Sequence, residues 1–205
     1  MKFKSNYVIA SCIIIAALGI TTYAYQNNIF FNVGQKVKDI TKNNDTGIVA
    51  VVGDKKITKK EFDTFKTLYS ASDNIPSDTE LIEKMIKNEV IYEQAIKDNI
   101  NVSEEELDKA LQEQKDIIAK DRDANMSYKN YVSGLNITEE EYWEKAKEGI
   151  KKALIRGKYK NKLKESFKEE NPDIKDNEFQ AKFNKYYNDI VTTLKNGMKI
   201  ENYIK

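Results

Sequence analysis

Histidine is absent from the 205 residues, and the sequence has a single cysteine, Cys12. Without histidine, the chain lacks the commonest general base, the commonest metal ligand and every serine–histidine or cysteine–histidine dyad. One cysteine cannot form an intramolecular disulfide. These absences weigh against an enzyme, and we expect no catalytic residue, no metal site and no cofactor.

Arginine is also scarce, since Arg122 and Arg156 are the only two in the sequence. Lysine and arginine together number 34 against 33 acidic residues, which leaves a net charge of +1. A nucleic-acid-binding domain would show a basic excess and the bidentate contacts that arginine makes. We therefore expect no nucleic-acid partner.

Two prolines and eight glycines leave little room for long linkers.

The N-terminal segment 1–26 contains a long apolar run, "YVIASCIIIAALGITTYAY", from Tyr7 to Tyr25. As a helix this run would be ~28 Å long, close to the ~30 Å hydrocarbon thickness of a bilayer. Lys2 and Lys4 precede it, which favours a cytoplasmic N-terminus and an extracytoplasmic remainder. We predict a single-pass membrane anchor. The expected anchor residues are Tyr7, Ile13, Ile14, Ile15, Leu18 and Tyr25.

Two alternatives remain open for this segment. The small residues Thr22 and Ala24 in "TTYAY" offer a site for signal cleavage, after which the protein would be secreted. "VIASC" is also similar to a lipobox, with Cys12 as the lipidated residue, although the apolar run continues beyond it. The length of the run favours retention as an anchor.

Residues 27–46 are polar and weakly patterned, and we interpret them as a tether. A buried strand is predicted at 48–52 in "GIVAVVGDKKIT", followed by a turn at Gly53 and a brief return strand. Residues 47–205 then read as one mainly helical domain.

Four helix starts carry the same capping-box pattern, a hydroxyl residue followed three positions later by glutamate. They are Thr58–Glu61, Ser77–Glu80, Ser103–Glu106 and Thr138–Glu141. Apolar residues spaced three and four apart follow each one, as expected for the core face of an amphipathic helix; Ile118 after the third start and Trp143 after the fourth are among them. A short helix is also predicted in "MSYKNYVSGLN", between the third and fourth.

The last part of the chain returns to strand character. Pro172 ends the fourth helix, a fifth long helix follows, and Gly197 ends that helix. Residues 199–204 then resemble a strand. Because a lone two-stranded hairpin is marginal, we predict that 48–52 pairs with 199–204 and closes the helical domain.

The order of these elements resembles the N-terminal domain of SurA- and PrsA-type extracytoplasmic chaperones. The resemblance rests on "VVGDKKITKKEF", "LIEKMIKNEVIYEQAIKDNINVSEEELDKAL", "YKNYVSGLNITEEEYWEKAKEGI" and the closing "FNKYYNDIVTTLKNGMKIENYI". It implies an irregular helical fold and the binding of unfolded or secreted polypeptides. Many members also carry a parvulin prolyl-isomerase domain with active-site histidines; this chain has no histidine, so we expect no isomerase active site.

We therefore hypothesise a membrane-anchored extracytoplasmic chaperone without covalent chemistry. Rigid, amphipathic tyrosines outside the main apolar stripes are expected at the surface and are the candidate client-binding residues: Tyr92, Tyr128, Tyr131 and Tyr159. The alternative is an adaptor or structural protein, held at the membrane, that binds one specific envelope partner. The sequence does not indicate an oligomeric state.

Overall fold

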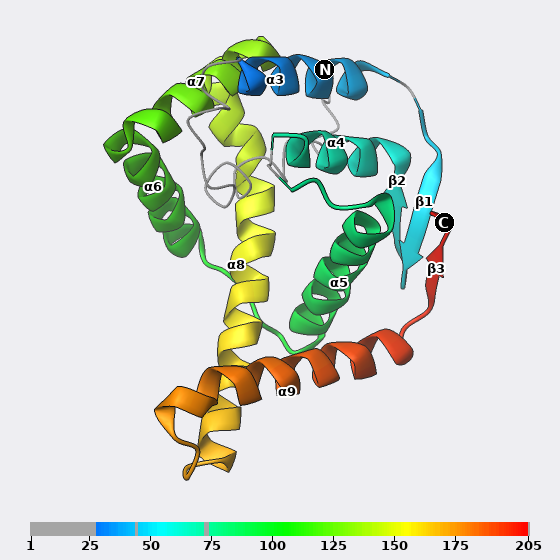
Figure 1. Cartoon of the computed structure of the whole chain (residues 1–205), viewed down its shortest axis with the longest axis vertical. Helices are drawn as coiled ribbons and strands as arrows, with labels where there is room; N and C mark the ends of the chain where they lie inside the picture. Colours follow the sequence, from blue (N-terminus) through cyan, green and yellow to red (C-terminus); the bar gives the residue numbers. More distant parts are fainter. Residues whose placement is uncertain (1–27, 44, 72–73, 205) are drawn as a thin grey trace.

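The computed structural model describes residues 28–43, 45–71 and 74–204, which form seven helices and a three-stranded sheet (Figure 1). In chain order the elements are α3 (Ile29–Lys42), β1 (Ile48–Val52), β2 (Lys55–Thr58), α4 (Lys59–Tyr69), α5 (Asp78–Lys97), α6 (Glu104–Lys120), α7 (Arg122–Leu135), α8 (Glu139–Glu170), α9 (Asp176–Asn196) and β3 (Ile200–Asn202). The predicted mainly helical class is confirmed.

The sheet pairs residues 48–52 with the C-terminal strand, as predicted. Its order is β2-β1-β3, and both neighbours run antiparallel to β1. Ala50 is opposite Asn202, and the amide of Tyr203 donates to the carbonyl of Val49 at 2.9 Å. The chain end thus completes a sheet whose inner face packs on α4 and α5, where Ala50 and Val52 are buried.

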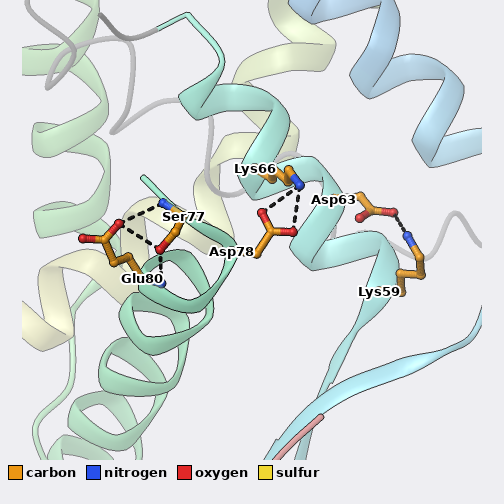
Figure 2. A network of polar contacts seen from close by, with 6 residues as sticks. All are labelled: Lys59, Asp63, Lys66, Ser77, Asp78 and Glu80. Carbon is orange, nitrogen blue, oxygen red and sulfur yellow. Dashed lines mark hydrogen bonds and ion pairs between the residues drawn. The ribbon is translucent and has the colours of Figure 1, made fainter. Parts of the chain in front are cut away.

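All four predicted capping boxes are present, at Thr58, Ser77, Ser103 and Thr138. Figure 2 shows the second: the Ser77 amide donates to the Glu80 carboxylate at 2.8 Å, and the Glu80 amide donates back to the Ser77 hydroxyl at 3.3 Å. Each cap contributes about 1 kcal/mol to helix stability. The turns between helices are therefore specified locally, which fixes where each helix begins.

The long helix α8 runs through the middle of the molecule (Figure 1). The helices α6 and α7 lie on one side of it, and α5, α4 and the sheet lie on the other; α9 crosses its far end. The larger apolar core joins α3, α6, α7 and α8 with residues of α4, α5 and α9, and a second core lies between the sheet, α4 and α5.

The interpretation of residues 27–46 as a tether is wrong for α3. This segment is a 14-residue helix that packs against α7 and α4. Phe30, Val33 and Val37 are buried at the helical spacing of three and four. Because this stripe is buried, α3 is part of the domain. Polar residues between its members make the stripe hard to recognise in the sequence.

The backbones of α3 and α7 touch where they cross. A methyl group on Gly34 would lie 2.3 Å from the carbonyl oxygen of Tyr131, and one on Gly134 would lie 2.2 Å from the carbonyl oxygen of Phe31. No real Cβ tolerates such distances. Glycine at both positions is therefore required for α3 to dock on α7.

The expected anchor residues Tyr7, Ile13, Ile14, Ile15, Leu18 and Tyr25, together with Cys12, lie outside the described residues. Among the helices from α3 to α9, none is both long and apolar enough to cross a membrane.

We predict that Gly34→Ala and Gly134→Ala each lower the free energy of unfolding by roughly 1–3 kcal/mol, because the new methyl group forces the two backbones apart. The measurement is urea unfolding followed by circular dichroism. The matched control is Gly157→Ala, since Gly157 is an exposed glycine in α8 with open space at its Cβ position. That control is expected to stabilise by about 0.5–1 kcal/mol. Equal effects at the three glycines would contradict the close crossing.

Candidate functional site

A pocket of about 410 Å³ lies where α6, α7 and α8 meet. It is lined by Lys115, Ile118 and Ala119 of α6, Asn125 and Tyr128 of α7, and Glu139, Glu140, Trp143 and Glu144 of α8. We call it the α6–α7–α8 pocket. Because successive lining residues on each helix lie about one turn apart, each helix contributes one face.

Two tight connections bring the three helices together. Asp121 ends α6 and at the same time caps α7, since its carboxylate accepts from the amide of Ala124 at 2.9 Å. Asn136 ends α7 in the left-handed conformation, with φ of 57°, and Thr138 immediately caps α8. Asparagine tolerates this conformation better than most residues. The walls of the pocket are thus set by short, sequence-specified turns.

An aromatic cluster lies beside and beneath the pocket. The ring centroids of Tyr128 and Trp143 are 5.7 Å apart, and Tyr142 lies 5.2 Å from each of them. Tyr131 continues the cluster into the core, 6.2 Å from Tyr142. The three pairs that Tyr142 forms are edge-to-face, and pairs of that kind each add about 0.5–1.5 kcal/mol beyond area burial. Trp143 and Tyr128 therefore form a rigid apolar floor with Ile118.

Charged residues surround this floor. The ammonium of Lys115 lies 5.4 Å from the centroid of the Trp143 ring, within cation–π range. The pKa of Glu140 is lowered by hydrogen bonds to its carboxylate, first of all one from its own backbone amide. The nearby charge of Lys115 lowers it further. Glu144 holds Lys147 at 2.7 Å. The pocket therefore combines an aromatic floor with a mainly acidic rim.

The expectation that the four candidate tyrosines lie on the surface is wrong for three of them. Tyr128, Tyr131 and Tyr159 are 3%, 0% and 4% exposed. Tyr131 is buried in the core that α3, α7 and α8 share: its ring faces Tyr142 of α8, and its backbone carbonyl lies against Gly34 of α3. Tyr128 alone lines the pocket, so the structure brings only one predicted residue to it.

The other two tyrosines lie away from the pocket, where α8 approaches α5 and α9. Tyr92 is half-buried on α5 with the Lys152 ammonium 4.9 Å from its ring centroid. Burial raises the pKa of both Tyr92 and Tyr159. These phenols stay neutral at physiological pH and serve as packing residues between helices.

Sequence reasoning assigned Trp143 and Ile118 to helix core faces and did not identify Lys115. Both apolar assignments hold, because each side chain is largely buried, but the same side chains also line the pocket. The available signal was composition: Trp143 is the only tryptophan in the chain, and it directly follows the acidic first turn of α8. The sequence shows that the glutamates and Trp143 are neighbours, but it does not show that Lys115, Ile118 and Ala119 of α6 lie opposite them.

The residues that line this pocket are of the types that bind a ligand by burial and charge. The pocket offers aromatic surface and carboxylates but no histidine or cysteine beside them. Over residues 28–43, 45–71 and 74–204, no group of three or more potential ligands could hold a metal ion. An open aromatic floor with a charged rim is suited to hold a side chain that has both an apolar and a polar part.

Comparison with known protein families matches residues 2–160 to the SurA-like N-terminal domain. Comparison with curated proteins found no match. The matched segment contains every residue of the α6–α7–α8 pocket, whereas α9 and β3 lie beyond it. Because the match spans well over half of the chain, the protein belongs to the family with a SurA-like N-terminal domain.

Proposed function

We propose that this protein is a membrane-anchored extracytoplasmic chaperone that binds unfolded or secreted polypeptides. One observation carries the proposal: a SurA-like N-terminal domain presents an open pocket with Trp143 on its floor. Aromatic floors of this kind hold apolar side chains without demanding a particular sequence, because the contact is mainly non-directional burial.

Binding in this proposal is shallow and reversible. An apolar client side chain that leaves water for the Trp143 floor gains roughly 1.5–3 kcal/mol, and ordering of the unfolded client opposes that gain. Affinity for any single segment is therefore low. A holder of unfolded chains needs this property, because its clients must be released to fold.

The proposed activity uses no covalent step. The chain has no histidine, and the pocket offers neither a nucleophile with a partner base nor a metal cluster. Family relatives with a parvulin domain would catalyse prolyl isomerisation, and we propose that this chain does not. Its contribution to folding is then to delay aggregation.

The proposed membrane location rests on residues 7–25, an apolar run preceded by Lys2 and Lys4. The helix α3 begins only four residues after this run, at Ile29. A short connection would keep the chaperone domain close to the outer surface of the membrane, where secreted chains emerge unfolded. Signal cleavage and lipidation at Cys12 are the competing outcomes.

We predict that the full-length chain in phosphatidylcholine vesicles suppresses aggregation of several unrelated unfolded proteins at near-stoichiometric amounts, as measured by light scattering. Ala119→Tyr is expected to require a roughly tenfold higher concentration, because the new ring fills the pocket and removes one apolar contact of ~1.4 kcal/mol. Ala119 is exposed, so the substitution leaves the core intact.

The matched control is Lys120→Tyr, the same new side chain on an exposed neighbour outside the pocket lining. It is expected to behave as the wild type. No suppression of any client would contradict the chaperone proposal. Capture of one partner in a strict ratio, without suppression of the others, would favour an adaptor.

We predict that the chain, expressed in its own cells, stays in carbonate-washed membranes and that protease added to the outside of the cells digests its folded domain. The reason is the apolar run 7–25, which is long enough to span the bilayer. Immunoblotting with an antibody to residues 28–204 gives the readout. A shortened chain recovered in the medium would contradict a retained anchor and match signal cleavage.

A further inference from the structure

The pocket floor is already in contact with a cation. Lys115 places its ammonium 5.4 Å from the Trp143 ring centroid, and within the described chain it forms no ion pair with a carboxylate. The aromatic face therefore accepts a positive charge at the pocket, at a site where acidic side chains are close by but do not hold that charge directly.

The rim carries more negative charge than Lys115 neutralises. Glu139, Glu140 and Glu144 line the pocket, and among the residues that the structure describes only Glu144 has a basic partner outside it, Lys147. Acidic residues in a first helical turn are ordinarily explained by the helix dipole. Glu104–Glu106 in the first turn of α6 fit that explanation, because the pocket lining does not include them. Glu139 and Glu140 differ, because they share a pocket with Trp143.

We propose that the α6–α7–α8 pocket binds the arginine side chain of a client segment, its guanidinium stacked on Trp143 and paired with the Glu139 and Glu140 carboxylates. This inference rests on the proposed function, and it narrows the client class to segments in which an arginine accompanies apolar residues. Charge complementarity selects this occupant over an acidic segment. An uncharged apolar side chain would leave the carboxylates unused.

The guanidinium competes directly with Lys115 for the same ring. Arginine is more weakly hydrated than lysine, stacks flat on aromatic rings and forms bidentate pairs with carboxylates. A client arginine therefore displaces the Lys115 ammonium into water at little cost. Lys115 acts as a replaceable internal cation that covers the aromatic floor when no client is bound.

The test uses the full-length chain in zwitterionic phosphatidylcholine vesicles and three tryptophan-free peptides that differ at one central residue: arginine, its neutral isostere citrulline, or glutamate. Trp143 is the only tryptophan of the chain, so its fluorescence reports binding at the pocket. We expect the arginine peptide to bind about tenfold more tightly than the citrulline peptide, and the glutamate peptide to bind most weakly.

Two substitutions test which pocket residues cause the preference for arginine. Glu140→Gln is expected to reduce the preference for arginine over citrulline to about threefold or less, whereas Glu105→Gln, at the corresponding first-turn position of α6 but outside the pocket, leaves it unchanged. Lys115→Ala is expected to tighten arginine-peptide binding two- to fivefold, because the competing cation is gone. Weaker binding of the arginine peptide to the Lys115→Ala variant would overturn the proposed displacement of Lys115 by a client arginine.

The outcomes separate the two proposals. Equal binding of the arginine and citrulline peptides would overturn the arginine preference and leave the chaperone proposal standing. If none of the three peptides changes the Trp143 fluorescence and the chain also fails to suppress aggregation, both the arginine preference and the chaperone proposal are overturned. Preference for the glutamate peptide would show that Lys115, rather than the glutamates, selects the client.

Discussion

The contact between α3 and α7 at Gly34 and Gly134 is the constraint on which the candidate site depends. The two backbones approach so closely that neither position has room for a methyl group. α7 in turn packs between α3 and α6, and it carries Tyr128 into the pocket beside Trp143 of α8. A shift of α3 would move α7 and therefore one wall of the pocket. The segment that follows the predicted membrane anchor is thus part of the same packing unit as the proposed client site.

The three-stranded sheet is a second constraint on the domain. β1 lies in the centre of the sheet and pairs with β3 from the chain end, which ties α9 back to the α4–α5 side. This leaves the α6–α7–α8 side free of the closure. The domain therefore has one side closed by the sheet and another that presents an open aromatic pocket. With this arrangement, the proposed client binding at the pocket would require no rearrangement of the core.

The parts predicted correctly from the sequence are those with local causes. Each capping box needs only a hydroxyl residue and a glutamate three positions later, and all four form. α3 was missed because its reason for folding is tertiary: Gly34 weakens a helix in isolation and becomes favourable only against α7. The tyrosines were misplaced for a related reason. Tyr131 lies in the buried stripe of α7 with Tyr128 and Leu135, and the α3 and α8 residues that cover this stripe come from distant parts of the sequence.

Hydrogen exchange of the full-length chain in phosphatidylcholine vesicles, followed by mass spectrometry with and without a saturating unfolded client, tests most directly whether clients bind at the α6–α7–α8 pocket. The account predicts slower exchange in segments 115–128 and 139–144 and unchanged exchange in the sheet. Protection confined to the sheet or to α9, with none around Trp143, would contradict it.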